Sequence, residues 1–193
     1  MTKRVSQIIL ILGILLFASA LALLVVNRIA IPGNKDKAAA IAEEMVELMP
    51  EVQNGYPDGK GDTVMPSIEL DGVDFVGIIE IPAYNVCLPV ANKWSAKDVS
   101  KYPHRFDGSI YDSSLIIGGS DNEGQFDFMK NISTGDTVYF TDTLGARYTY
   151  AVSEILITED VSYEKLSDGE GELSFFARNS YGFEYTVVRC KLD

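Results

Sequence analysis

Few side chains in this sequence could carry out nucleophilic or acid–base chemistry near neutral pH. The 193 residues include one histidine, His104, and two cysteines, Cys87 and Cys190. A thiol attacks as the thiolate, and a nearby imidazole can take up and return the proton. Catalytic pairs meet in space rather than in sequence, so Cys190 and His104 could form one. The alternative for His104 is a surface or packing role in a proline-containing loop. An oxidising compartment would also permit a Cys87–Cys190 disulfide, and the sequence leaves this open.

Polar side chains also follow the apolar run Leu115–Gly118. Ser120 lacks the Gly-x-Ser-x-Gly turn that presents the serine nucleophile in many hydrolases. The residues that come next lack the alternating ligands of a calcium loop, so we expect a solvated acidic loop and no metal site. These residues are Asp121, Asn122, Glu123 and Asp127.

The charge of the chain limits the classes of partner. The formal net charge is −12, from 16 basic and 28 acidic residues, and 47% of the residues are hydrophobic. Three of the basic residues (Lys3, Arg4 and Arg28) lie in or beside the first apolar segment, which leaves 13 basic against 28 acidic residues elsewhere. An acidic surface repels phosphates, which argues against nucleic acid as a partner and against docking driven by anionic lipid.

An apolar segment near the N-terminus predicts attachment to a membrane. The 19 residues Ile8–Val26 contain no charge, and as a helix they would span about 28 Å, close to the hydrocarbon thickness of a bilayer. Lys3 and Arg4 precede the segment, which favours a cytoplasmic N-terminus and an extracellular C-terminal domain. A cleavable signal peptide with a site near Ala18–Ala20 is the alternative, but the apolar run continues past that site. We expect an uncleaved signal anchor in the plasma membrane.

The rest of the chain predicts a short helix followed by strands. Residues 35–49 have the apolar spacing of an amphipathic helix, separated from the first helix by Pro32–Asn34, and residues 51–66 are rich in turn formers. From residue 67 onward, about eight short strands with few helices favour an all-β fold that closes into a barrel. We expect an anchor over residues 1–30, a juxtamembrane helix and linker over 31–66, and a β-barrel domain over 67–193. The predicted strands are Phe75–Ile81, Asn85–Val90, Leu115–Gly118, Thr137–Thr141, Ala146–Thr158, Leu173–Ala177 and Phe183–Leu192.

Several segments of the predicted barrel follow one another at a characteristic spacing. They are Phe75–Pro82, Leu88–Val90, Trp94–Ser95, Pro103–Ser109, Leu115–Phe126 and Gly135–Asp136. In this order they resemble the sortase family, close to the class B-like sortases of clostridia, over about Asp71 to Leu192. The resemblance implies a closed sortase barrel on a Gram-positive cell surface. It also implies a cysteine transpeptidase, which cuts a sorting motif of a secreted protein and passes the acyl group to an amine of the cell wall or a pilin.

Sortases use a cysteine nucleophile, a histidine acid and an arginine that stabilises the oxyanion. By the resemblance, Ser120 falls on the histidine position, and two alignments are open for the C-terminal strands. In the first, Thr186–Cys190 is the cysteine strand and Cys190 is the nucleophile. In the second, Thr186–Cys190 is the last strand, so that Arg178 falls on the cysteine position and Tyr185 on the arginine position. We favour the second, because a barrel without its last strand would expose an unpaired edge.

The favoured alignment predicts that all three catalytic positions are substituted. Arg178 is no nucleophile, Ser120 cannot exchange a proton near pH 7, and Tyr185 could donate only an uncharged hydrogen bond. We therefore expect a catalytically degenerate sortase-like protein without a cofactor. It would use these residues to bind an extended peptide, or a surface protein with a sorting signal, in the former substrate groove. The alternative is an active sortase that attaches surface proteins to the cell wall, with Cys190 as nucleophile and His104 as its partner.

Overall fold

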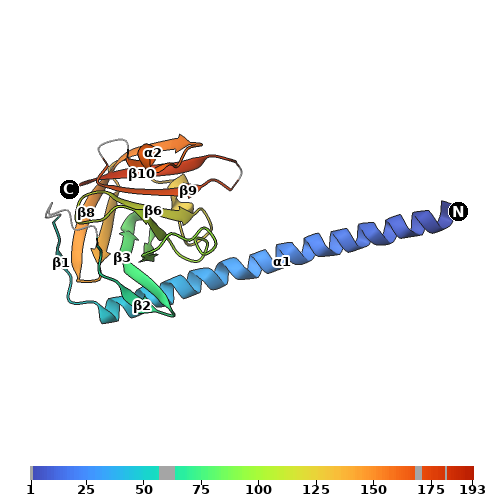
Figure 1. Ribbon diagram of the computed structural model, residues 1–193, viewed down its shortest axis with the longest axis horizontal. Helices are drawn as coiled ribbons and strands as arrows, with labels where there is room; N and C mark the ends of the chain where they lie inside the picture. The colour runs from blue at the N-terminus through green and yellow to red at the C-terminus, as the bar shows by residue number, and fades with distance from the viewer. Residues whose placement is uncertain (1, 57–63, 168–170, 181) are drawn as a thin grey trace.

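The computed structural model describes residues 2–56, 64–167, 171–180 and 182–193 of the chain. Figure 1 shows a long N-terminal helix whose C-terminal end lies against a β-barrel. This helix, α1, runs from Thr2 to Leu48. In the described part of the chain, three short helical segments lie between strands: η1 (Pro82–Tyr84), η2 (Asp127–Lys130) and α2 (Tyr163–Ser167).

Eight strands pair into a closed ring, which confirms the predicted all-β barrel. Around the ring the order is β3, β7, β8, β10, β9, β6, β5 and β4, and β4 pairs with β3 again. β1 adds to β8 in parallel and β2 adds to β3, so both lie outside the ring. The strands are β1 (Gln53–Asn54), β2 (Ile68–Leu70), β3 (Val73–Ile81), β4 (Val86–Ala91), β5 (His104–Asp107), β6 (Leu115–Ser120), β7 (Thr137–Asp142), β8 (Ala146–Thr158), β9 (Leu173–Arg178) and β10 (Tyr185–Leu192).

The wall formed by β6, β9 and β10 has two apolar faces. Because side chains alternate along a strand, every second residue points into the barrel. The inward set belongs to the main core and comprises Leu115, Ile117, Leu173, Phe175, Ala177, Val188 and Cys190. The outward set packs with Leu166 of α2 and comprises Ile116, Phe176 and Val187, with Tyr185 at its margin. The same strands therefore build the core and present an outer surface.

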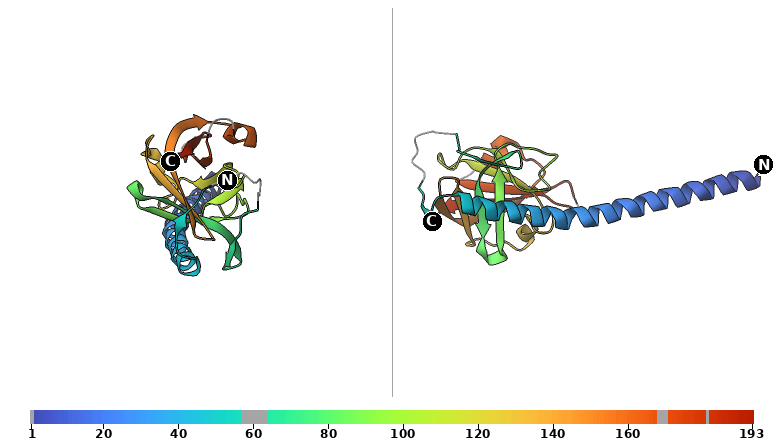
Figure 2. Two further views of the ribbon diagram at one scale, coloured as in Figure 1. Left: turned by 90° about the vertical axis from the view of Figure 1, so that its left-hand side faces the viewer. Right: turned by 90° about the horizontal axis from the view of Figure 1, so that it is seen from below.

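Helix α1 continues through Pro32, so the predicted break at Pro32–Asn34 is wrong. A proline within a helix removes one backbone hydrogen bond and crowds the preceding turn, at about 3 kcal/mol. The helix-forming segments on both sides of Pro32 outweigh this local preference. The predicted packing of the second segment on the domain is confirmed, since Ala38, Ala42 and Met45 are buried. The helix lies beside β4, and Figure 2 shows its N-terminal half projecting away from the barrel.

Parts of the predicted linker and one predicted loop belong to the sheet. Gln53–Asn54 pairs with β8, and Met65 is buried in the core, whereas linker residues 57–63 lie outside the described residues. Strand β5 was not predicted, because Pro103 and the polar sequence of His104–Asp107 hide its extended backbone. His104 is therefore a buried strand residue rather than a loop residue.

The C-terminal strands follow the second of the two predicted alignments. β9 ends at Arg178 and β10 begins at Tyr185, so Thr186–Cys190 lies in the last strand. β10 pairs with β9 on one side and with β8 on the other, which completes the ring.

Candidate functional site

Ser120, Arg178 and Tyr185 lie side by side at one end of the β6–β9–β10 wall, and we call them the substituted site. Ser120 pairs with Arg178 across the parallel strands β6 and β9. Arg178 pairs in turn with Tyr185 across the antiparallel strands β9 and β10. Residues directly opposite on neighbouring strands project from the same face of a sheet. The structure therefore brings the three predicted positions together on the outer face of the barrel.

The polar groups of the substituted site are available to a ligand. Arg178 is exposed, and Ser120 and Tyr185 are half-buried. Among the described residues, none of these three side chains has a hydrogen-bond or ion-pair partner. The Arg178 guanidinium lies 5.8 Å from the centre of the Phe183 ring. A hydroxyl, a phenol and an unpaired cation can together bind backbone carbonyls and a carboxylate, but they cannot form a thiolate.

Aromatic rings lie next to the substituted site on the same face. Phe176 is two residues before Arg178, and its ring centre is 6.1 Å from that of Tyr185 and 5.3 Å from that of Phe106. The Trp94 ring lies 5.8 Å from Phe176 and 5.2 Å from Phe106. Gly118 makes room for Trp94, because a Cβ at that position would be 2.3 Å from Trp94 Cζ3. These rings form an apolar surface beside three polar groups.

Buried Gln125 ties the end of β6 to the segment that carries Trp94. The Gln125 side-chain oxygen accepts a hydrogen bond from the Ser120 backbone N–H. The Gln125 Nε2 donates to the Val99 carbonyl at 3.0 Å, and the side chain is only 4% exposed. Both ends of one amide are thus used to fix the position of Ser120 relative to the Trp94 segment.

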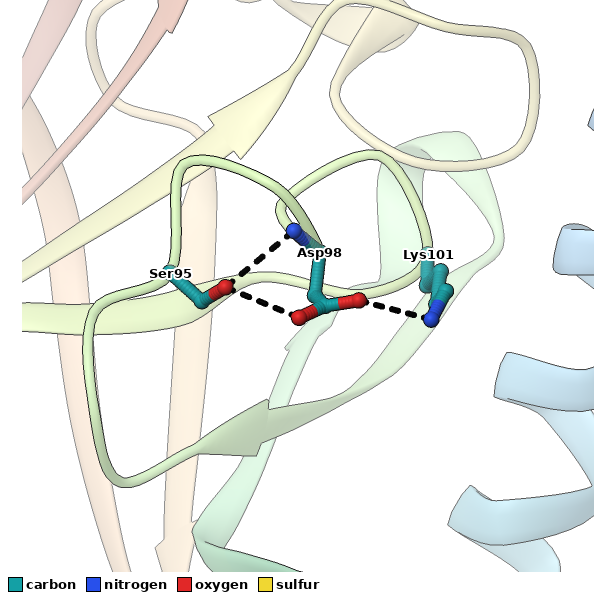
Figure 3. A network of polar contacts seen from close by, with 3 residues as sticks. All are labelled: Ser95, Asp98 and Lys101. Atoms are coloured by element: carbon teal, nitrogen blue, oxygen red, sulfur yellow. Dashed lines mark hydrogen bonds and ion pairs between the residues drawn. The ribbon is translucent and has the colours of Figure 1, made fainter.

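The residues after Trp94 form a turn that is held by polar contacts among Ser95, Asp98 and Lys101 (Figure 3). The Ser95 hydroxyl donates to Asp98 Oδ2 at 2.9 Å and accepts from the Asp98 backbone N–H at 3.2 Å. Lys101 Nζ lies 2.6 Å from Asp98 Oδ1. The hydrogen bond from Lys101, followed by that from Ser95, lowers the pKa of the Asp98 carboxyl below its ordinary value. These contacts close the turn that follows Trp94.

We compared the sequence and the structure with known proteins. The chain matches no protein-family model and no curated protein. Among solved structures it is similar to sortase C1 from Streptococcus agalactiae, at 22% identity and a TM-score of 0.55 over 65% of this chain and 70% of that one. It is also similar to a Clostridium perfringens sortase C determined with the C-terminal cell wall sorting motif, at 18% identity and a TM-score of 0.54 over 84% and 87%. Sortase C-1 from Actinomyces oris gives 20% identity and a TM-score of 0.54 over 82% and 98%.

The chain has the sortase fold. The similar structures named here are C-type sortases, and a Listeria monocytogenes sortase A is similar too, at 17% identity and a TM-score of 0.52 over 62% of this chain and 87% of that one. The class B likeness of the sequence therefore stays a prediction.

The structure does not bring together the alternative sortase pair, Cys190 and His104. Cys190 is fully buried in the barrel core, and burial raises the pKa of its thiol far above the ordinary value. His104 pairs with Gly118 on β6 and lies beside Trp94, so it belongs to the outer face. Its Nδ1 lies 2.6 Å from the Lys93 carbonyl. The wall of the barrel separates the two groups, and a buried neutral thiol is a poor nucleophile.

The remaining cysteines and acidic side chains do not form a catalytic or metal-binding site in the described residues. Cys87 and Cys190 are both free thiols, one exposed and one buried, so the Cys87–Cys190 disulfide is absent between these two described residues. Asp121, in the predicted acidic loop, binds the Ser180 backbone N–H at 2.7 Å and the Ser180 hydroxyl at 2.6 Å. Within the described residues, no three His, Cys, Asp or Glu side chains are grouped to hold a metal ion.

Sequence reasoning missed the aromatic surface. Phe106 and Phe176 carried no local signal of function, because an aromatic residue in a strand is ordinarily a core residue. The one available signal was Gly118 directly after the apolar residues Leu115–Ile117, since a strand glycine often marks the close approach of another group.

Proposed function

We propose that this protein is a membrane-anchored, catalytically inactive sortase-fold protein that binds an extended peptide at the substituted site. The ligand would be a free peptide or the sorting-signal segment of a surface protein. Residues 1–30 would anchor the chain with the N-terminus in the cytoplasm, residues 31–66 would join the anchor to the barrel, and residues 67–193 would form the extracellular binding domain.

Anchoring is supported by one helix segment of the required length. Within α1, Gln7–Leu24 has a mean hydropathy of 2.7 and makes no buried contact with the rest of the chain. The described large apolar side chains of this segment are more than half exposed, for example Phe17 at 71% and Leu23 at 71%. A solvent-exposed apolar helix of this length is accounted for by lipid around it.

The observation that carries the binding proposal is the composition of the substituted site. Among the described residues, these three polar side chains have no hydrogen-bond or ion-pair partner, and they occupy the positions that the sequence resemblance assigns to the sortase histidine, cysteine and arginine. No thiol or imidazole lies at these three described positions. Peptide as the ligand class is supported by similarity to a sortase C determined with a sorting motif. The neighbouring aromatic surface of Trp94, Phe106 and Phe176 offers contact area for apolar side chains of such a peptide.

The experiment is a titration of the full-length chain in nanodiscs with sorting-motif peptides, with and without an amine acceptor. Trp94 is the only tryptophan in the chain, so its fluorescence reports a ligand on this face. We expect a saturable change in emission and no cleavage product. Arg178→Ala should weaken binding about tenfold, as loss of one charge-assisted contact predicts. Lys130→Ala, which removes an exposed cation from η2, is the matched control and should leave binding unchanged.

Restoring the three sortase catalytic residues tests whether the protein lacks only the catalytic side chains or also lacks a peptide-binding site. The triple variant Ser120→His, Arg178→Cys and Tyr185→Arg should acquire measurable thiol-dependent cleavage of the same peptide. Turnover by the unmodified chain would overturn the inactive assignment. Absence of binding by the unmodified chain, with a folded barrel, would overturn the proposed function.

A further inference from the structure

Helix α1 fixes the height of the barrel above the membrane that it is proposed to span. The helix is continuous from Thr2 to Leu48, and Ala38, Ala42 and Met45 are buried against the domain. The uncharged run ends at Val26. The side chain of Lys35 packs on Gly124, where a Cβ would be 2.4 Å from Lys35 Cδ. Nine residues of helix separate Val26 from Lys35, about 14 Å at 1.5 Å per residue.

The loop between β9 and β10 is hydrogen-bonded to the loop that contains Gly124. Asp121, three residues before Gly124, accepts two hydrogen bonds from Ser180 in that loop, at 2.7 and 2.6 Å. In Figure 1 and in the right-hand view of Figure 2, the end of the β9–β10 hairpin points to the side on which α1 leaves the barrel. The hairpin end is therefore directed toward the bilayer.

Phe183 stands out on this hairpin end. Its side chain is 81% exposed, the largest exposed fraction among the exposed large hydrophobic residues that the structure describes. The interfacial layer adds about 6 Å to each side of the hydrocarbon core, which leaves about 8 Å between that layer and the level of Gly124. The Asn179 N–H donates to the Glu184 carbonyl at 2.9 Å and the Gly182 N–H to the Asn179 carbonyl at 3.3 Å, so the chain turns here and Phe183 lies at the end of the hairpin. Because this end points toward the bilayer, the exposed Phe183 ring is the apolar group that the hairpin presents to the interfacial layer.

We propose that Phe183 inserts into the interfacial layer of the bilayer that α1 spans, with the Arg178 guanidinium beside it at headgroup depth. This inference rests on the anchoring part of the proposed function. Aromatic residues are enriched at this depth, and an arginine over an aromatic ring places apolar area and charge at the same boundary. Because the chain outside the anchor is acidic, insertion depends on the aromatic ring and needs no anionic lipid. The substituted site then opens at the membrane surface.

The test uses the full-length chain in vesicles of zwitterionic lipid with bromine-labelled acyl chains. In a Trp94→Phe background, a single tryptophan is placed by Phe183→Trp, by Phe17→Trp within the span, or by Leu144→Trp. Leu144 is an exposed apolar residue in the turn beside Pro50, at the opposite end of the barrel from the proposed contact. We expect loss of emission and a blue shift for Phe183→Trp and Phe17→Trp, and neither for Leu144→Trp.

The outcomes separate docking from anchoring. Quenching of Phe17→Trp without quenching of Phe183→Trp would overturn docking and leave the anchor intact. Absence of quenching at Phe17→Trp would overturn both. Equal quenching of Leu144→Trp, or quenching of Phe183→Trp only with anionic lipid, would also overturn the inference. If Trp94→Phe impairs folding, spin labels at the same three positions in a Cys87→Ala chain give the same comparison, through their accessibility to oxygen and to a water-soluble nickel chelate.

Discussion

Substitution of Gly118 by alanine tests the placement of Trp94 beside the substituted site. A Cβ at Gly118 would lie 2.3 Å from Trp94 Cζ3 and 2.8 Å from Phe176 Cζ. Unstrained carbon atoms approach to about 3.5–4.0 Å, so the Trp94 ring must move by more than about 1 Å. The ring packs against Phe106, Phe176 and His104 and is 38% exposed, so we expect it to move outward into solvent.

The expected loss of stability follows from the contacts that this movement breaks. Each aromatic pair contributes about 0.5–1.5 kcal/mol beyond its buried area, and Trp94 has two such pairs, with Phe106 and Phe176. Replacing glycine by alanine restricts the unfolded chain and returns about 0.4–1 kcal/mol. The net destabilisation of Gly118→Ala should be about 1–2 kcal/mol, in the range for overpacking a well-filled site.

The assay is urea unfolding together with the emission of Trp94, the only tryptophan. Gly118→Ala should lower the urea midpoint and shift Trp94 emission to the red. A double-mutant cycle with Trp94→Ala, followed by circular dichroism, supplies the control. Because the indole is then gone, Gly118→Ala should destabilise the Trp94→Ala chain by less than it destabilises the unmodified one. Additive effects of the two substitutions, or an unchanged emission maximum, would refute the placement of Trp94 over Gly118.

Three further predictions concern the cysteines and Gln125. A water-soluble thiol reagent should label Cys87 in the folded chain and Cys190 only after unfolding, since the first is exposed and the second is fully buried; rapid labelling of Cys190 in the native state would contradict its position. Burial raises the pKa of Cys190, so the unfolded state loses the proton first above the ordinary thiol value of about 8.5, and stability should fall by up to about 1.4 kcal/mol per pH unit. Between pH 8 and pH 10, the free energy of unfolding measured in urea should fall less steeply for Cys190→Ala than for the unmodified chain. An identical slope would contradict the buried position of Cys190. Gln125→Leu leaves the Ser120 N–H and the Val99 carbonyl unpaired, which should destabilise the chain by about 2 kcal/mol and speed amide exchange at Ser120.

The strands that were predicted correctly carry a strong local pattern. β8 was predicted with its observed bounds, Ala146–Thr158, because alternating β-formers follow a clear Asp-to-Gly turn. β5 was missed because its four residues, His104–Asp107, gain their extended conformation from pairing with β6 rather than from their own propensity. The helix break predicted at Pro32 is wrong, because the helical segments on both sides outweigh the tendency of a single proline to end a helix.

The candidate site was predictable in its strand residues but not in its surroundings. Ser120, Arg178 and Tyr185 could be aligned because the order of strands in a known fold fixes which residues become neighbours. The position of Trp94 depends on where a twelve-residue connection between β4 and β5 crosses the sheet. Contacts such as Gln125 to the Val99 carbonyl decide that path, and they join residues 26 positions apart. Such contacts leave no periodic signal in the sequence.

The unbroken course of α1 has a consequence for how partners would meet this protein. If α1 spans the bilayer as proposed, one continuous helix joins the span to the barrel. The barrel would then stay at one height above the membrane, and its motion would be mainly lateral diffusion and rotation about the membrane normal. A partner chain in the same membrane would meet it by diffusion in two dimensions, and fewer relative orientations would have to be searched.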